Sequence, residues 1–240
     1  MINWPHDTRI LIPSYRSAAQ LKRFVAALLT VVPKDHILVV DDASKDGTYE
    51  FCQQEGINCI RHSVNKGKGA ALKTGFAYFA GDAGVRWILT MDADGQHSPS
   101  DIPLFIDTAR KYPSTGLCIG ARDMRLGAMP PARILSNRLT SLILALLSGR
   151  RIKDAQCGYR IYSRRLVSSI VLRYNRFEME SEIILMAAAK KFSIRFVRVQ
   201  TLYLSDGPSH ISHLADTLRW VVAVLRVWWD VRLLKTRLNI

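Results

Sequence analysis

Apolar and polar positions follow two different periods along the first half of the chain. Short β-rich runs at residues 9–13, 36–41 and 87–91 predict strands, and the near-continuous apolar run at 36–41 is typical of a strand that is buried on both faces of a parallel sheet. Residues 18–32 instead carry apolar side chains at helical spacing, which predicts an amphipathic helix. Strands and helices that alternate in this way predict an α/β fold with a mostly parallel sheet flanked by helices. The other elements expected in this half are strands at 58–61 and 116–121 and helices at 48–54, 70–80 and 99–111.

The regular alternation stops after residue 122. We expect a loop at 123–131, then an amphipathic helix at 132–147 and a basic cluster at 150–153. The chain contains no internal repeat, low-complexity tract or linker, so a single domain over residues 1–240 with a C-terminal helical elaboration is expected. The last elements predicted are a helix at 178–191, a strand at 194–199 and a long terminal helix at 214–234.

The formal net charge of +14 is concentrated in the second half of the 240 residues. Residues 1–120 hold 13 basic and 12 acidic side chains, whereas residues 121–240 hold 21 basic and 8 acidic ones. Such a surplus favours an anionic partner, which is a nucleic acid, a membrane surface or a phosphorylated substrate. The hydrophobic share of 48% and the charged share of 22% are ordinary for globular proteins and exclude wholesale disorder.

The cysteines and the N-terminus bear on the compartment. None of the four cysteines forms a C-x-x-C pair, so neither a zinc knuckle nor a dithiol redox motif is expected. The N-terminus has no basic segment followed by an apolar one, and no apolar stretch reaches the ~20 residues that a membrane-spanning helix needs. These features predict a cytoplasmic location.

Acidic residues stand at the ends of two of the predicted strands. Asp41 and Asp42 end one strand, and Asp92 and Asp94 follow another. Ligands of open α/β sheets bind beyond the carboxyl ends of the strands, so both pairs are expected at one crevice. Asp92 and Asp94 are two positions apart, which in extended chain places both carboxylates on one face, where they can share a Mg²⁺ or Mn²⁺ ion. The alternative, that these aspartates only cap the next helix, suits a single acidic residue better than two pairs.

A glycine-rich loop at residues 65–69 (NKGKG) precedes the helix at 70–80. It lacks the G-x-x-x-x-G-K-[ST] pattern of a P-loop, and no G-x-G-x-x-G follows the first strand. Neither a P-loop NTPase nor a dinucleotide-binding domain is therefore predicted. The simplest interpretation is a turn that starts the helix, in which Lys68 is placed to reach a phosphate.

Six short motifs occur in order along most of the chain. They are residues 10–15 (ILIPSY), 39–48 (VVDDASKDGT), 65–70 (NKGKGA), 91–97 (MDADGQH), 120–122 (GAR) and 154–160 (DAQCGYR). This series resembles glycosyltransferase family 2, whose members have the GT-A fold, and is nearest to the dolichol-phosphate-mannose-synthase-like and polyprenyl-phosphate glycosyltransferases. The resemblance covers residue 9 to about residue 209. It implies inverting transfer of a sugar from a nucleoside-diphosphate sugar.

The resemblance makes residues 1–122 the nucleotide-sugar-binding half. By analogy, Pro13, Tyr15 and Asp41 hold the base and ribose, with Asp42 beside them. The D-x-D of Asp92 and Asp94 carries Mg²⁺ or Mn²⁺, which neutralises the leaving nucleoside diphosphate. The expected nucleotide-sugar-binding residues are Pro13, Tyr15, Asp41, Asp42, Lys68, Asp92 and Ala93, and the expected metal ligands are Asp92, Asp94 and Gln96.

The same resemblance makes residues 123–209 the acceptor-side half. A hydroxyl acceptor needs a carboxylate base, for which Asp154 is the first candidate and Glu180 the second. A phosphate acceptor is already ionised and needs no base, and Arg122 and Arg138 are then expected as phosphate clamps. The acceptor-side loop is expected to contribute Gln156, Gly158, Tyr159 and Arg160 as well.

Two departures from the family pattern bear on the substrates. Family members commonly continue the first motif with Asn-Glu, where this chain has Arg16 and Ser17. Residues 203–210 (YLSDGPSH) lack the basic residues that the polyprenyl-phosphate branch carries around its G-x-S. A lipid or lipid-phosphate acceptor is the leading expectation, and a soluble sugar acceptor is the alternative.

The terminal helix predicted at 214–234 presents a wide apolar arc that includes Trp220, Trp228 and Trp229, with basic residues beyond it. An arc of this kind predicts that the helical segment 210–240 lies peripherally on an anionic membrane surface at its cytoplasmic face, with the helix at 132–147 as a second contact. The alternative is packing on the core or on another subunit of an oligomer. No nucleic-acid partner is expected, because the chain gathers carboxylates at a crevice instead of interleaving aromatic and basic residues.

Overall fold

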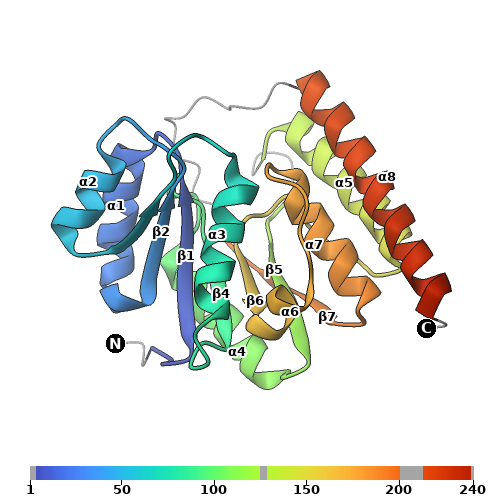
Figure 1. The fold of residues 1–240 in the computed structure, drawn as a ribbon, viewed down its shortest axis with the longest axis horizontal. Helices are drawn as coiled ribbons and strands as arrows, with labels where there is room; N and C mark the ends of the chain where they lie inside the picture. Colours follow the sequence, from blue (N-terminus) through green and yellow to red (C-terminus); the bar gives the residue numbers. More distant parts are fainter. Residues whose placement is uncertain (1–3, 125–128, 201–212, 239–240) are drawn as a thin grey trace.

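The computed structural model describes residues 4–124, 129–200 and 213–238, and in these residues a seven-stranded sheet is flanked by helices (Figure 1). The described strands lie in the order β3-β2-β1-β4-β6-β5-β7, and all of them pair in parallel except β6. The predicted α/β class with a mostly parallel sheet is confirmed. The strands are β1 (Thr8–Ser14), β2 (Ile37–Asp41), β3 (Asn58–Arg61), β4 (Trp87–Thr90), β5 (Thr115–Ala121), β6 (Arg160–Ser163) and β7 (Ser193–Arg198).

Local sequence patterns account for the elements of the first half. Every residue of β2 is buried, as expected for a strand that has helices on both faces of its sheet. The helix expected at 99–111 begins with the 3-10 turn η2 (Pro99–Asp101), because the side chain of Ser98 accepts a hydrogen bond from the Ser100 backbone and caps that turn. The helices of this half are α1 (Ala18–Leu29), α2 (Thr48–Glu55), α3 (Lys68–Ala80) and α4 (Ile102–Lys111), and the 3-10 turn η1 (Lys34–His36) precedes β2.

Strand β6 and helix α6 (Arg164–Ser169) are elements that the sequence pattern does not predict. β6 has four residues, all buried, and begins with the charged Arg160, so neither alternation nor an apolar run marks it as a strand. It pairs with β4 in antiparallel register, with Arg160 opposite Thr90. The motif at 154–160 is thereby carried to the carboxyl end of β4. The predicted elements of this half are observed as α5 (Pro131–Ser148), α7 (Glu178–Ala189), β7 and α8 (His213–Leu238).

Helix α7 packs against both α5 and α8, and these three helices lie on the side of the molecule away from α1 and α2 (Figure 1). One face of α8 is buried through Val224, Val227 and Val231, as the packing alternative predicts. No helix in the described part of the chain is long and apolar enough to cross a membrane. Residues 203–210, which depart from the family pattern, lie outside the described residues.

Candidate active site

The loops that follow β1 and β2 are tied to each other at the carboxyl end of the sheet. The backbone N–H of Arg16 donates to Ser44 Oγ at 2.9 Å, and the backbone N–H of Ala18 donates to Asp46 Oδ2 at 2.9 Å. Arg16, which stands where the family commonly has Asn, adopts a left-handed φ of 50° and lays its guanidinium over the Tyr15 ring at 5.2 Å. Tyr15 is thereby held at the surface of this edge with 39% of its area exposed.

Asp41 is completely buried where β2 ends, one strand away from Pro13. Its Oδ1 accepts a hydrogen bond from the Ser44 backbone at 3.0 Å, and its Oδ2 lies 3.4 Å from Arg61 Nε. Among the described residues no donor completes a hydrogen bond to Oδ2. A buried carboxylate oxygen without such a partner is unfavourable, and the nearby Arg61 guanidinium offsets its charge.

The carboxylate of Asp42, by contrast, is hydrogen-bonded by other residues of the chain. Its carboxylate accepts hydrogen bonds from the backbone of Lys66 at 2.9 Å and of Gly67 at 2.7 Å, and it lies 2.6 Å from His62 Nδ1. His62 Nε2 is in turn 2.9 Å from Thr74 Oγ1 on α3. These contacts do not support the predicted role of Asp42 in holding the nucleotide, and they make it the anchor of the glycine-rich loop.

Asp92 and Lys68 form an ion pair between the D-x-D and the glycine-rich loop. Lys68 Nζ lies 2.7 Å from Asp92 Oδ1 and 3.1 Å from Glu180 Oε1, the latter at the start of α7. Burial alone would raise the pKa of Asp92, but the neighbouring Lys68 ammonium lowers it to about 2. Asp92 is therefore a carboxylate at neutral pH, and Lys68 joins the glycine-rich loop to the start of α7.

Asp94 has the opposite electrostatic setting. Burial, followed by the negative charge of Asp92, raises its pKa, while its Oδ1 accepts the backbone N–H of Gln96 at 2.9 Å. Two carboxylates that repel each other across the buried Ala93 suit a divalent cation, which removes the repulsion. No group of three or more His, Cys, Asp or Glu side chains in the described part of the chain can complete a metal site. A cation here would take its other ligands from phosphate oxygens and water, as Mg²⁺ commonly does.

Asp92 of the D-x-D packs closely against Gly158 of the 154–160 motif. A Cβ built at Gly158 would lie 2.4 Å from Asp92 Oδ2, so only glycine permits this approach. His97 supports the same turn, since its Nδ1 accepts the Asp92 backbone N–H at 3.1 Å and its ring stacks on Tyr159 at 4.9 Å. Burial lowers the pKa of His97 to about 4, so the ring that stacks on Tyr159 is neutral.

Asp154 is the acceptor of a dense set of hydrogen bonds. Arg122 donates to it through Nε at 2.8 Å, through Nη2 at 3.0 Å and through its backbone at 3.1 Å. Asn137 Nδ2 and the Gln156 backbone donate to the same carboxylate at 2.7 and 3.2 Å. Burial by itself would raise the pKa of Asp154, but these bonds, led by Arg122, lower it. A saturated carboxylate with a lowered pKa does not support the predicted role of a general base.

Two more of the expected acceptor-side residues face the protein interior. Arg160 is fully buried and donates to the carbonyl oxygens of Ala155, Cys157 and Glu180 at 2.7–2.9 Å. Tyr159 is also fully buried, and its hydroxyl donates to the Ser98 carbonyl at 3.1 Å. The predicted acceptor contacts of these two side chains are therefore not supported, and both shape the loop from within.

Arg138 and Gln156 stay accessible on the acceptor side. Both are exposed, and Gln156 Nε2 lies 3.1 Å from each of two hydroxyls on α5, those of Ser136 and Thr140. A cavity of about 260 Å³ opens where β5 and β7 end, and the charged residues that line it are Arg122, Asp123, Lys153 and Arg198. Arg198 lies 3.4 Å from Asp123, and the lining keeps a surplus of basic residues.

Some residues of the site were beyond sequence reasoning. His62 and Asn137 contact Asp42 and Asp154, from which they lie 20 and 17 residues apart in sequence. The sequence does carry a signal for Asn137, because Asn137 and Ser141 place two polar residues on the otherwise apolar face of α5. In the structure the Ser141 hydroxyl donates to Asn137 Oδ1 at 3.1 Å. His62 has no such signal.

Known proteins resemble this chain in sequence and in fold. The model of glycosyl transferase family 2 matches residues 9–171. The chain is 32% identical over 220 residues to a UDP-N-acetylglucosamine–dolichyl-phosphate N-acetylglucosaminyltransferase of Methanococcus voltae, covering 81% of this chain and 85% of that protein. It is 29% identical over 170 residues to an undecaprenyl-phosphate mannosyltransferase of Micrococcus luteus, covering 68% of each.

Among solved structures, glucosyl-3-phosphoglycerate synthase from Mycobacterium tuberculosis, in complex with Mn²⁺, UDP and glucosyl-3-phosphoglycerate, has a TM-score of 0.70. That match covers 94% of this chain and 80% of the other at 16% identity, and it shows the GT-A fold. Together with the match to the family model, these likenesses identify the chain as an enzyme that belongs to glycosyltransferase family 2.

Proposed function

We propose that this enzyme transfers a sugar from a nucleoside-diphosphate sugar to a lipid-phosphate acceptor, with inversion at the anomeric carbon and with a divalent cation bound. The observation that carries the proposal is the position of three aspartates at the carboxyl edge of the sheet. Asp41 ends β2, Asp92 and Asp94 follow β4, and these two strands flank β1. A basic cavity opens at the ends of β5 and β7 in the same sheet. The two relatives named above, which act on dolichyl and undecaprenyl phosphate, support the choice of acceptor.

The donor's base and ribose are assigned to the edge formed by Pro13, Tyr15 and Asp41. Asp41 Oδ2, which accepts no hydrogen bond from the described residues, would accept one from an N–H of the nucleobase. The Tyr15 ring is exposed and offers a face on which a base or ribose can pack. Both features favour recognition of the nucleoside over recognition of the sugar at this end.

The diphosphate is assigned to the D-x-D. Asp92 and Asp94 would hold Mg²⁺ or Mn²⁺, with the Gln96 backbone orienting Asp94. When bound, the cation would neutralise charge on the departing nucleoside diphosphate. Lys68 keeps Asp92 ionised and contacts its Oδ1 at 2.7 Å, and its ammonium would stand near the diphosphate as a second positive charge.

A phosphate acceptor agrees with the state of the two candidate bases. Asp154 is saturated by Arg122 and other donors, and Glu180 is paired with Lys68, so each carboxylate is committed to a cation. An acceptor that arrives already ionised needs neither of them to take its proton. Arg122, Lys153 and Arg198 line the cavity at the ends of β5 and β7 and would bind the acceptor phosphate. A soluble sugar with a hydroxyl nucleophile is the less favoured alternative.

The test of this proposal is transfer of radiolabelled sugar from nucleoside-diphosphate sugars to a polyprenyl phosphate, with Mn²⁺ or Mg²⁺ and with EDTA. Asp94→Asn should lower turnover at least about a hundredfold with an unchanged melting temperature, since it removes one of two carboxylates that would bind the cation. Asp107→Asn is the matched control, because Asp107 is an exposed aspartate on α4, and it should keep full activity. Equal activity of the two variants, or full activity in EDTA, would refute the metal assignment, and a product with retained anomeric configuration would refute inversion.

We further propose that α5 and α8 hold the enzyme on the anionic membrane surface where a lipid phosphate resides. Each helix exposes apolar side chains at helical spacing: Leu135, Leu139, Leu142 and Leu146 on α5, and Leu218, Val222, Leu225 and Trp229 on α8, each at least half exposed. Of the three tryptophans in the predicted arc, Trp220 and Trp228 are half-buried against the core, which leaves Trp229 as the exposed anchor.

Vesicle binding tests this surface. Leu139→Asp should reduce sedimentation with anionic vesicles at low salt, whereas Leu104→Asp, which changes an exposed leucine on α4, should leave it unchanged. Equal binding of both variants would contradict the assignment of the docking surface and would leave the assignment of the active site intact.

A further inference from the structure

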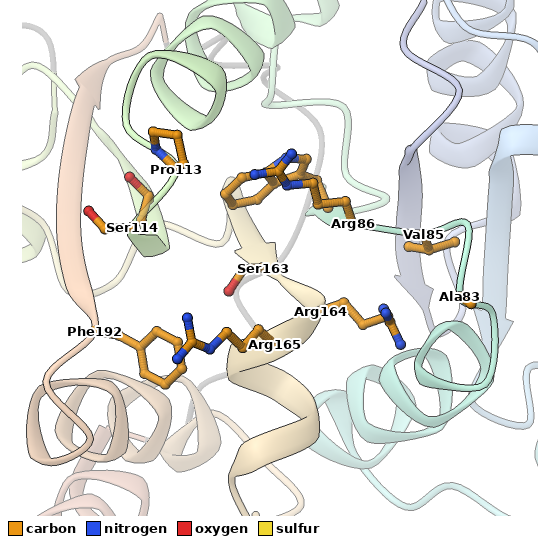
Figure 2. Close-up of a pocket in the computed structure, with 11 residues that line it drawn as sticks. Ala83, Val85, Arg86, Pro113, Ser114, Ser163, Arg164, Arg165 and Phe192 are labelled. Carbon is orange, nitrogen blue, oxygen red and sulfur yellow. The ribbon is translucent and has the colours of Figure 1, made fainter.

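A cavity of about 380 Å³ opens at the end of the sheet opposite the candidate active site (Figure 2). Its lining comes from the segments where β4 and β5 begin and where β6 passes into α6, and includes Trp87 and Ser163, which are paired across β4 and β6. Asp92 follows Trp87 by five residues of extended chain, or about 16 Å, so the cavity is separate from the D-x-D. It shares no lining residue with the site described above.

The cavity is strongly basic. Arg86, Arg164 and Arg165 line it, and no acidic residue does. Within the described part of the chain none of the three forms a salt bridge, and the one hydrogen bond recorded for their side chains is a long one of 3.4 Å from Arg164 to the Ala80 carbonyl. Figure 2 shows Ser163 with Arg86 on one side and Arg165 on the other, while the Arg164 guanidinium points away from them toward Ala83. Guanidinium groups with donors to spare favour an anion.

Hydroxyl groups complete the set of donors. Ser114, Thr115 and Ser163 line the same cavity. Thr115 is 2% exposed, and its hydroxyl has no hydrogen-bond partner among the described residues, which is unfavourable for a buried polar group in the absence of a ligand. Ser163 Oγ accepts the Leu166 backbone N–H and keeps its own hydrogen to donate.

The walls of the cavity limit what else the ligand carries. Trp87 and Phe192 supply aromatic surface, with Arg86 5.8 Å from the Trp87 ring and Arg165 5.7 Å from the Phe192 ring. A guanidinium that stacks on an aromatic ring is held in place and loses little freedom when it binds. A volume of about 380 Å³ is near the lower limit for ligand pockets, which suits a phosphate with a small organic group.

We propose that this cavity binds a small phosphorylated molecule, recognised through its phosphomonoester dianion by Arg86 and Arg165, with Arg164 adding positive charge to the lining. The inference does not rest on the proposed function, because none of its residues belongs to the donor or acceptor site. The phosphomonoester belongs either to a soluble compound or to a lipid headgroup, and the two sources share the same recognition chemistry.

Calorimetric titration of the full chain tests the site, with glycerol phosphate as the soluble probe and EDTA present to suppress binding at the D-x-D. Arg165→Ala should weaken binding about tenfold or more, because it removes a charge-assisted contact. Arg23→Ala, an exposed arginine on α1, is the matched control and should bind like the unaltered chain. Vesicles with and without phosphatidic acid form the second arm, and an Arg165-dependent gain with phosphatidic acid identifies the lipid as the source.

Two further variants separate this site from the rest of the molecule. Thr115→Val keeps the shape of the buried side chain and removes its hydroxyl, so it should weaken glycerol phosphate binding without lowering the melting temperature. Asp94→Asn should leave this binding unchanged. The proposal is overturned if Arg165→Ala binds both probes as tightly as Arg23→Ala, or if Asp94→Asn abolishes the binding that Arg165→Ala leaves intact.

Discussion

The contact between Gly158 and Asp92 makes the substitution Gly158→Ala a sharp probe of the active site. The added Cβ would lie 2.4 Å from Asp92 Oδ2 and 2.9 Å from both Cγ and Oδ1. Non-bonded carbon and oxygen atoms need about 3.4 Å, so the carboxylate or the loop must move by about 1 Å. The loop is held by a 2.9 Å hydrogen bond from Thr90 Oγ1 to the Gly158 carbonyl, and the carboxylate is held by Lys68.

The size of the effect follows from that displacement. Misplacing a group that organises the reactants by about 1 Å costs on the order of a hundredfold in turnover. Overpacking of a well-filled interior costs about 1–3 kcal/mol, which for a chain of this size lowers the melting temperature by about 2–12 °C. We therefore expect Gly158→Ala to remain folded at 25 °C and to lose most of its activity.

Steady-state transfer assays and thermal melts measure the two quantities on one preparation. Gly81→Ala is the matched control, because a Cβ at Gly81 meets nothing closer than the Tyr78 carbonyl at 3.7 Å and its backbone is helical. It should keep full activity and gain slightly in stability. Activity of Gly158→Ala within twofold of that of Gly81→Ala would show that Asp92 tolerates displacement, and would refute its role at the centre of the site.

Three other substitutions test the contacts that predicted site residues make in the structure. Asp42→Asn should lower the free energy of unfolding by about 1.5–3 kcal/mol in urea titrations, because it weakens the anchor of the glycine-rich loop; a raised donor KM with unchanged stability would restore its predicted nucleotide contact. Arg160→Met should cost about 3–5 kcal/mol by the same measurement, since it leaves three buried carbonyl groups unpaired, and a loss of activity alone would contradict this. Asp154→Asn and Arg122→Gln should be non-additive in a double-mutant cycle, and simple addition of their effects would contradict the pair.

Strand and helix positions could be predicted because they depend on neighbours close in sequence. The buried run of β2 and the helical spacing in α1 carry their own signals, and residues 9–13 and 87–91 fall within one residue of β1 and β4 at their carboxyl ends. β6 was not predicted because it depends on residues that are distant in sequence. Its burial between β4 and β5 depends on partners about 40–75 residues away and not on any period of its own.

The D-x-D was predictable as a pair of carboxylates at a strand end, since the spacing of two residues and the preceding strand are both local. The protonation state of those carboxylates was not, because Lys68 and Glu180 reach Asp92 from other segments. The sequence shows Asp41 and Asp42 as equivalent neighbours. In the structure Asp41 keeps an oxygen that accepts no hydrogen bond from the described residues, whereas Asp42 accepts hydrogen bonds from the backbone of residues 66–67.

Sequence alone therefore carries the family, the order of the elements and the residue types of the chemistry, because periodicity and short motifs are properties of neighbouring positions. Tertiary structure decides which of the candidate side chains are available. Arg160 and Asp154 match the family motif as well as Asp94 does. In the folded chain, however, Arg160 donates to buried carbonyl groups and Asp154 is paired with Arg122, 32 residues away. A charged group that is buried must find partners, and only the three-dimensional arrangement determines whether those partners belong to the protein or to a substrate.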